Sequence, residues 1–295
     1  MIHGATRGGY SRLVLSTTAK VRVLGSADVP AFLALAEQDP VVNVFVDYRA
    51  RMTRLDPAWL GGEVVGRFVD GDLVSALHVG ANLVPVQAGP RDLDDFARHL
   101  RGLPATWATL VGPHPAVERL WGLLQDDYAP PREERWRQPH LELTGAPAIA
   151  GDPLVRRTTE ADLLALYPAC VAMYTEEVGV SPETGGGGPL YRARVRQLVN
   201  RGWSFARFDD AGRVVFKAEV ASVTPHAAQI QGVWIAPEWR GKSLAAAGMA
   251  RVAELVLSEI APTASLYVNE WNHPARAAYA RAGFVETARF STIMF

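Results

Sequence analysis

The sequence predicts a mixed α/β protein of two similar domains in tandem, each with a twisted, mostly antiparallel sheet flanked by helices. The chain has 295 residues, enough for about two domains of roughly 150 residues. Its content of 48% hydrophobic and 21% charged residues is that of a globular protein. Strand-like and helix-like segments follow one order in the first half and return in nearly the same order in the second.

The first domain is expected over residues 20–150, after a flexible lead-in over residues 1–19. The turn residues Asp70-Gly71-Asp72 separate two alternating segments and so predict a hairpin. The expected strands are Ala19–Leu24, Glu63–Val69, Leu73–Val79, Asn82–Val86, Thr106–Val111 and His140–Leu143. The expected helices are one from the cap Ser26-Ala27-Asp28 through Ala36, then Asn43–Met52, Asp92–Leu100 and Ala116–Gln125.

Clustered prolines predict a boundary before the second domain, residues 151–295. The glycines at 185–188 favour a flexible connector, with a lid over a binding site as the alternative. The expected strands are Leu154–Arg157, Ser204–Phe208, Val214–Ser222, Gln229–Ile235, Ser265–Val268 and Val285–Phe295. The expected helices are one from the cap Thr159-Glu160-Ala161-Asp162 to Glu177, then Leu190–Asn200, Ser243–Ile260 and Pro274–Ala282.

Two short fragments occur in both halves and favour an internal duplication. Ala27-Asp28 opens the first helix of the first half, as Ala161-Asp162 does in the second. His114-Pro115-Ala116 and His273-Pro274-Ala275 each precede a later helix. The two spacings differ, so insertions would separate the copies.

Charge and cysteine content exclude several function classes. The net charge of −1 offers no general attraction to nucleic acid or to an anionic membrane. The lone cysteine, Cys170, can form neither an internal disulfide nor a cysteine-rich metal site, and no metal site is expected. No uncharged stretch approaches 18 apolar residues. We therefore expect a soluble, cytoplasmic protein and leave its oligomeric state open.

The segment from Gln231 to Ala245 predicts a strand, a tight turn and the start of a helix. A helix start presents unpaired backbone N–H groups and the positive end of the helix dipole, which together suit a phosphate or diphosphate. Small residues there allow close approach of a ligand, while Arg240 and Lys242 add positive charge. The alternative is an ordinary turn with exposed basic residues. Neither a P-loop nor a dinucleotide-binding pattern is present.

Two segments resemble the GNAT superfamily of acyl-CoA N-acyltransferases. Residues 240–245 are similar to the family's acyl-CoA loop, Arg/Gln-x-x-Gly-x-Gly/Ala, although Ser243 replaces the middle glycine. Residues 269–284 are similar to the family's segment Asn-x-x-Ala-x-x-x-Tyr-x-x-x-Gly-Phe, in register at Asn272, Ala275, Tyr279, Gly283 and Phe284. The resemblance covers roughly residues 153–295.

The resemblance implies the GNAT fold, with acetyl-CoA as cosubstrate and an amine as acceptor. In that family the asparagine touches the cofactor and the tyrosine faces its sulfur, which implies these roles for Asn272 and Tyr279. The diphosphate would lie against the loop residues Arg240, Gly241, Lys242, Ser243, Leu244 and Ala245. We expect a backbone N–H group at Val233 or Ile235 to polarise the thioester carbonyl.

The residue chemistry itself leaves alternatives open at Tyr279 and Asn272. A phenol with a pKa near 10 can protonate a thiolate of similar basicity, so Tyr279 is the expected general acid. Its alternative role is that of a packed helical tyrosine. Asn272, just before a helix, is also a good helix cap.

The expected general base is Glu219, acting through water, because an amine must lose a proton before or during attack. If Val214–Ser222 is a strand, Lys217 and Glu219 share one of its faces, so the alternative for Glu219 is an ion pair with Lys217. On the next strand, alternation would place Gln229, Gln231, Val233 and Ile235 on one face, while Gly232 indicates a bulge or close ligand approach. His226 is expected to be a plain loop residue.

The first half lacks both the acyl-CoA loop pattern and a tyrosine at the position of Tyr279. Residues 83–92 contain no Arg-Gly-Lys-like cluster, and Leu120 stands where Tyr279 stands in the second half. We expect a degenerate GNAT-like domain that shapes the acceptor cleft, similar to the inactive half of tandem enzymes such as mycothiol synthase.

The predicted function is that of an N-acetyltransferase in which the amine attacks acetyl-CoA directly within a ternary complex. Cys170 is expected to be buried and not an acyl carrier. The alternatives are a non-catalytic acyl-CoA-binding regulatory module and a partner-binding scaffold. The acceptor, a small molecule or a protein amine, and the acyl-chain length stay open.

Overall fold

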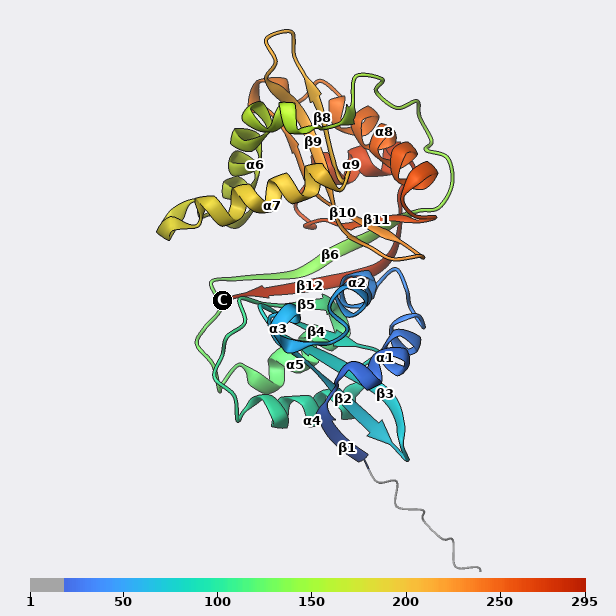
Figure 1. Ribbon diagram of the computed structural model, residues 1–295, viewed down its shortest axis with the longest axis vertical. Coiled ribbons are helices and arrows are strands. Elements are labelled where there is room, and N and C mark those ends of the chain that lie inside the picture. Colours follow the sequence, from blue (N-terminus) through green and yellow to red (C-terminus); the bar gives the residue numbers. More distant parts are fainter. Residues whose placement is uncertain (1–18) are drawn as a thin grey trace, which may run out of the picture.

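The computed structural model describes residues 19–295, so residues 1–18 of the expected lead-in lie outside the described part (Figure 1). The first half contains strands β1 (Ala19–Val23), β2 (Glu63–Val69), β3 (Asp72–Val79), β4 (Asn82–Val86), β5 (Thr109–Pro113) and β6 (Glu133–Leu143). Its helices are α1 (Val29–Ala36), α2 (Val44–Thr53), α3 (Pro57–Leu60), α4 (Pro90–Leu100) and α5 (His114–Leu124).

The second half repeats this order. Its strands are β7 (Arg156–Arg157), β8 (Ser204–Phe208), β9 (Val214–Val223), β10 (Ala228–Ile235), β11 (Ala264–Tyr267) and β12 (Val285–Met294). Its helices are α6 (Leu163–Val178), α7 (Gly188–Asn200), α8 (Leu244–Glu259) and α9 (His273–Ala282). The predicted mixed α/β class is confirmed, since the strands pair antiparallel except at β4–β5 and β10–β11.

One 12-stranded sheet runs through both halves in the order β1-β2-β3-β4-β5-β12-β6-β11-β10-β9-β8-β7. The final strand of each half is exchanged: β12 pairs with β5, and β6 pairs with β11, while β6 and β12 lie against each other (Figure 1). Residues 20–150 and 151–295 remain our proposed domains, and this exchange joins them.

Several elements differ from the prediction, among them β5, which covers Thr109–Pro113 instead of Thr106–Val111. Strand β6 begins at Glu133 rather than near His140, because pairing with β12 orders a charged segment that carries no strand-like alternation. The short helix α3 was not predicted, and β7 has only two residues. The predicted glycine-rich connector is partly ordered: Thr184–Gly186 forms a single 3-10 turn, and α7 begins at Gly188.

The duplicated fragments occupy matching places in the two halves. Arg22 pairs with Asp28 at 2.7 Å, and Arg156 pairs with Asp162 at 2.8 Å. The hydrogen bonds from these guanidinium groups lower the pKa of both carboxyl groups to about 2. The same ion pair therefore opens each half, in agreement with the predicted duplication.

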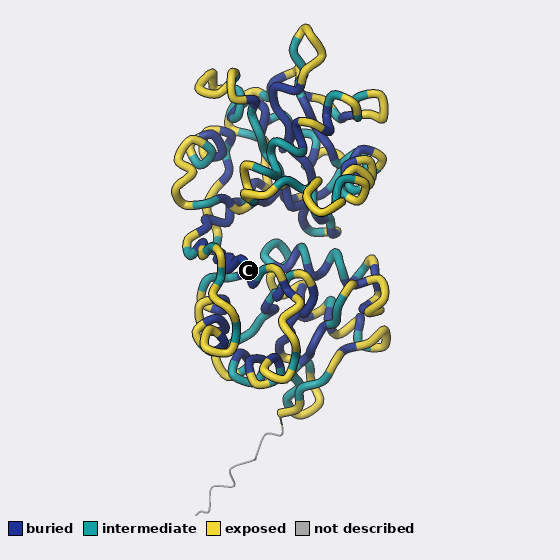
Figure 2. The backbone as a smooth tube through the Cα atoms, turned by 90° about the vertical axis from the view of Figure 1, so that its left-hand side faces the viewer, coloured by how far each residue is buried: buried dark blue, intermediate teal, exposed yellow. Residues whose placement is uncertain are grey.

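Helices cover both faces of the sheet in each half. In the first half, α4 and α5 pack on one face and α1 and α2 on the other. In the second half, α8 and α9 pack on one face and α6 and α7 on the other. Figure 2 shows the buried segments inside both halves and the exposed turns outside them. Each half is thus a three-layer unit with its own core.

The exchanged strand β6 carries a buried histidine with a lowered pKa. His140 is fully buried and stacks on Phe290, with ring centroids 4.8 Å apart. Burial lowers its pKa from 6.5 to about 4, although Glu142 Oε1 lies 3.7 Å from Nδ1. The folded protein therefore resists protonation of His140 at mildly acidic pH.

We predict that His140 makes the fold acid-sensitive. Because its pKa is lower in the folded state, the unfolded chain takes up the proton first, and stability is lost as pH falls from 6.5 towards 4. Urea unfolding should show a loss of about 2 kcal/mol between pH 7 and pH 5 from this group. In His140→Leu this part of the pH dependence should vanish; an unchanged slope would contradict the assignment.

Candidate active site

A cleft of about 1890 Å³ opens where neighbouring strands separate. Strands β10 and β11 pair in parallel only at Ala228–Ala264 and Gln229–Ser265, and then diverge. In the first half β4 and β5 diverge in the same way after two residue pairs. Residues of both halves line the cleft, among them Tyr48 of α2 and Tyr279 of α9.

A β-bulge at Gly232 deforms β10 at the mouth of this gap. The register moves from Gln231 opposite Glu219 to Trp234 opposite Lys217, so one extra residue is accommodated on β10. Gly232 has a φ of +60°, and an added Cβ would lie 3.0 Å from Lys217 Nζ. Both the backbone conformation and the space require glycine. The predicted bulge is confirmed.

The bulge also makes one prediction wrong. Simple alternation placed Gln231, Val233 and Ile235 on one face of β10. Val233 and Ile235 instead pack towards the α8–α9 core, whereas Gln231 contacts Glu219 on the other face. The extra residue at Gly232 reverses the alternation, because each inserted residue exchanges the two faces of a strand.

A buried ion pair lies directly beneath the bulge. Lys217 is fully buried, and its Nζ donates to Glu219 Oε2 at 3.0 Å and to the Gly232 carbonyl at 2.9 Å. Gln231 Nε2 donates to the other carboxylate oxygen of Glu219 at 2.9 Å. Both oxygens of Glu219 are therefore held in place, and the side chain borders the cleft. The ion pair with Lys217 considered from the sequence is present.

Cys170 of α6 completes this buried group. Burial would lower the pKa of Lys217, but the charge of Glu219 and the contact with Cys170 outweigh it and raise the pKa. Burial raises the pKa of the Cys170 thiol to about 11. A thiol with such a pKa is a poor nucleophile at neutral pH, and the side chain is buried as predicted.

The turn between β10 and α8 has two residues in the left-handed conformation. Gly241 has a φ of +75°, and Ser243, the residue that precedes α8, has a φ of +59°. Ser243 stands where the GNAT loop pattern has glycine, and its conformation is one that favours glycine. Its hydroxyl makes no capping hydrogen bond to α8. The serine thus keeps the backbone course of the turn at a cost in strain.

The cationic side chains of this turn lie at the surface. Arg240 donates to Glu176 Oε2 at 2.7 Å and to the Ile235 carbonyl at 3.0 Å. Lys242 Nζ lies 4.6 Å from the centre of the Trp239 ring. Leu244 and Ala245 begin α8 beside them and border the cleft.

The second predicted segment also lines the cleft. Asn272 Oδ1 accepts a hydrogen bond from the Ala275 N–H at 3.2 Å, so Asn272 caps α9 as one alternative expected. Tyr279 is buried on α9 and borders the cleft. Burial, and next the charge of Glu177, raise the pKa of Tyr279 above its ordinary value. The phenol therefore stays protonated well above neutral pH.

The matching place in the first half differs from the turn before α8. There Asp92 Oδ2 accepts from the Gly89 N–H at 2.8 Å, at the start of α4. Asp92 also pairs with Arg67 at 3.0 Å. In the matching strand β4, Pro85 has no N–H to offer. On α5, Leu120 is fully buried in the hydrophobic core. A carboxylate of the chain itself thus caps the start of the helix that matches α8.

Two family models match the chain. The acetyltransferase (GNAT) family matches residues 190–284, which contain the bulge, the turn and Tyr279. Residues 190–284 form a GNAT domain. A domain of unknown function, DUF4081, matches residues 62–166, in agreement with a degenerate first half. The resemblance stated from the sequence is thereby confirmed.

Solved structures share the GNAT fold over nearly the whole chain. An acetyltransferase of the GNAT family from Colwellia psychrerythraea is 14% identical, with a TM-score of 0.59, and the match covers 94% of this chain and 99% of that chain. A GCN5-related N-acetyltransferase from Sphaerobacter thermophilus is 20% identical, with a TM-score of 0.61 and coverages of 93% and 94%. A tandem GNAT protein from the clavulanic acid biosynthesis pathway is 16% identical, with a TM-score of 0.53 and coverages of 94% and 98%. A search of curated proteins found no match.

Sequence reasoning missed several residues around the GNAT domain's cleft. Glu176 of α6 holds both Arg240 and the Trp234 indole N–H, and Glu177 pairs with Arg135 of β6. These contacts join distant segments, and no local pattern signals them. Within residues 19–295, no helix is long and apolar enough to cross a membrane, and no three metal-ligating side chains gather at one point.

We predict that Ser243→Gly stabilises the protein. Glycine adopts the left-handed conformation without the strain that a Cβ causes, so the free energy of unfolding should rise by about 0.5–1 kcal/mol. Urea unfolding monitored by circular dichroism measures this change. Ser243→Ala retains a Cβ and serves as the matched control. Equal effects of the two substitutions would show that the φ of residue 243 is not the cause.

Proposed function

We propose that the protein is an N-acetyltransferase that moves the acetyl group of acetyl-CoA to an amine acceptor. The observation that carries this proposal is the bulged strand β10, which diverges from β11 immediately before the left-handed turn at the start of α8. Such a gap can receive an extended thioester arm at its centre and a diphosphate at its end. The GNAT family match supports the same function.

In this proposal the diphosphate lies against Arg240–Ala245. The first N–H groups of α8 have no partner within the helix, and Arg240 and Lys242 are exposed beside them. The Arg240–Glu176 ion pair is about half exposed, so it contributes only about 0.2–1 kcal/mol and can be exchanged for a phosphate. Asn272 lies at the start of α9 on the cofactor side of the cleft.

The acceptor amine attacks the thioester carbonyl directly. We assign polarisation of the carbonyl oxygen to the backbone N–H of Val233 or Ile235, the residues that follow the bulge. Glu219 takes the proton of the amine through water, with Lys217 and Gln231 holding its two carboxylate oxygens. No covalent enzyme intermediate is required, so positioning of the two substrates supplies most of the acceleration.

Tyr279 then protonates the departing thiolate of CoA. Its buried environment keeps the phenol neutral at the pH of the reaction, so the proton is present when the C–S bond breaks. Tyr279 lines the same cleft as Gly232 and Val233.

We predict that Tyr279→Phe lowers the turnover number by tenfold or more while the affinity for CoA changes less than twofold. The substitution removes only the proton donor and leaves a ring that fits the same core. Thiol release from acetyl-CoA, measured against a panel of amines, reports turnover. Calorimetry reports CoA binding.

Tyr128→Phe is the matched control, because Tyr128 donates its hydroxyl to the Leu100 carbonyl in the first half, away from the cleft. Its turnover should equal that of the wild-type protein. Glu219→Gln should also lower turnover if Glu219 is the base. Unchanged turnover in Tyr279→Phe would remove its assigned role. CoA binding without thiol release for any amine would favour the acyl-CoA-binding module instead.

A further inference from the structure

The glutamates that line the cleft all have ion-pair partners, whereas most of the arginines that line it do not. Seven arginines and four glutamates line it, with neither lysine nor aspartate among the lining residues. Every one of the glutamates is ion-paired: Glu133 and Glu177 with Arg135, Glu176 with Arg240, and Glu219 with Lys217. Within residues 19–295, the lining arginines without a carboxylate partner within 4.0 Å are Arg49, Arg132, Arg194, Arg201 and Arg281.

Three of these arginines, Arg49, Arg194 and Arg201, line the same part of the cleft as Tyr48 or lie beside one another there. Arg201 donates to the Tyr48 hydroxyl across the two halves, and Arg49 is the next residue of α2. Arg49 also lies close enough to Arg194 for their charges to interact. We call these three residues the arginine cluster.

Two helices supply the cluster from opposite sides of the cleft. Helix α2 belongs to the first half and α7 to the second (Figure 1). Tyr48 and Arg49 line the cleft from α2, and Arg194 and the C-cap residue Arg201 line it from one face of α7. The same face of α7 carries Tyr191, whose hydroxyl donates to the Cys170 carbonyl at 2.9 Å. Cys170 contacts Lys217, so the cluster adjoins the buried group that holds Glu219.

In the part of the chain that the structure describes, neutral oxygen atoms and no carboxylate group receive the hydrogen bonds of the arginine cluster. The guanidinium of Arg49 is directed to the carbonyl oxygens of Trp59 and Leu60, and Arg194 donates to Gln197 Oε1 at 3.1 Å. Burial, together with the charge of Arg194, lowers the pKa of Arg49. Like charges held together in a partly buried place are unfavourable, and a bound anion would relieve this repulsion.

We propose that Arg49, Arg194 and Arg201 bind an anionic oxygen group, a carboxylate or a phosphate, of the acyl acceptor. Guanidinium groups bind these planar or tetrahedral anions through paired hydrogen bonds. The acceptor is then an amine that carries an acid group at some distance from its nucleophilic nitrogen. This inference rests on the proposed function, because only an acyltransferase has an acyl acceptor. Anion binding at the arginine cluster can nevertheless be tested without catalysis.

The first measurement is binding of inorganic phosphate and of glutarate to the CoA-saturated protein, by calorimetry. CoA fills the diphosphate turn, so the remaining anion site is the one measured. We expect the double variant Arg194→Gln/Arg201→Gln to lose at least tenfold in affinity for the anion that binds. Arg194→Gln alone, which removes only one exposed hydrogen bond, covers the case in which the double variant fails to fold.

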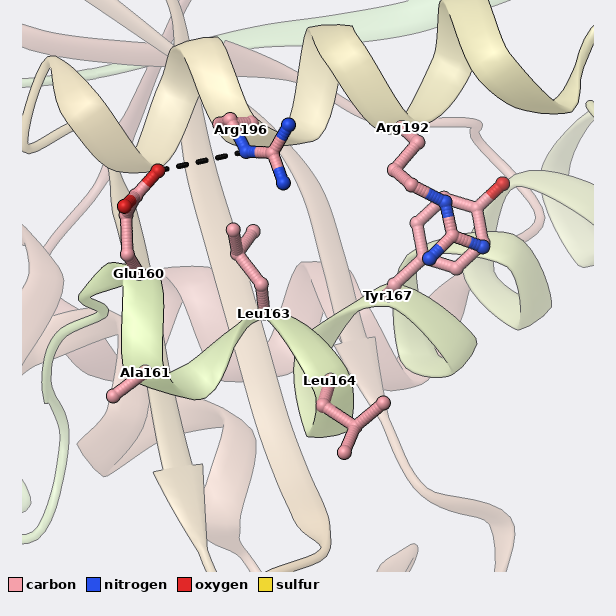
Figure 3. A pocket seen from close by; sticks show the side chains of 7 residues that line it. All are labelled: Glu160, Ala161, Leu163, Leu164, Tyr167, Arg192 and Arg196. Atoms are coloured by element: carbon pink, nitrogen blue, oxygen red, sulfur yellow. Dashed lines mark ion pairs between the residues drawn. The ribbon is translucent and has the colours of Figure 1, made fainter.

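The opposite face of α7 provides a control with the same change of charge. Arg192 and Arg196 project there towards α6, over a separate pocket of about 290 Å³ (Figure 3). Arg192 lies 4.0 Å from the centre of the Tyr167 ring, and Arg196 pairs with Glu160 at 3.5 Å. The double variant Arg192→Gln/Arg196→Gln should bind the anion as the wild-type protein does.

The second measurement compares matched amines in the thiol-release assay. Glucosamine 6-phosphate against glucosamine tests a phosphate, and 4-aminobutyrate against butylamine tests a carboxylate that is distant from the amine. The acid-bearing member of at least one pair should have the higher kcat/KM, and Arg194→Gln should reduce this preference by about tenfold.

Two results would overturn the proposal: neither anion binds the CoA-saturated wild-type protein, or both double variants lose affinity equally. Failure of CoA itself to bind would instead contradict the proposed function. In that case the same anion titration without CoA still decides whether the arginine cluster binds an acid group.

Discussion

The buried ammonium of Lys217 is the constraint on which the architecture of the site depends. A charged group without access to water requires partners, and Lys217 finds them in Glu219, Cys170 and the carbonyl of Gly232. The hydrogen bond from Lys217 to the Gly232 carbonyl keeps that carbonyl of the β10 bulge directed towards Lys217. The bulge in turn reverses the side-chain faces of β10, just after this strand has diverged from β11. One buried cation thus links the carboxylate, the bulge and the open cleft.

The exchange of β6 and β12 gives this cleft its second wall. Because each half pairs with the final strand of the other, the two halves cannot separate without breaking the pairing of β12 with β5 and of β6 with β11. Helix α2 of the first half is therefore held against β9 and β10 of the second. In the first half, Asp92 caps the helix that matches α8. This half nevertheless contributes to the site, because residues of α2 line the cleft.

Local patterns predicted the elements and the turn, but not the contacts between distant segments. Hairpins and helices follow from alternation, caps and turn residues, and the boundaries of β2, β4 and β8 agree with prediction to the residue. The bulge at Gly232 could be predicted because a glycine inside a strand is unusual. The strand exchange, the Glu176 contacts and the arginine cluster depend on pairings between residues far apart in sequence, which no local pattern contains. The left-handed conformation of Ser243 could not be predicted either, because serine rarely adopts a positive φ.

The most direct test of this account is hydrogen–deuterium exchange with and without saturating acetyl-CoA. The backbone amides of residues 240–245 should become protected, together with those of the bulge at Gly232, because the diphosphate and thioester would accept their hydrogen bonds. Residues 87–92, the matching turn of the first half, serve as the internal reference and should not change. Equal exchange of residues 240–245 in both states would contradict the account.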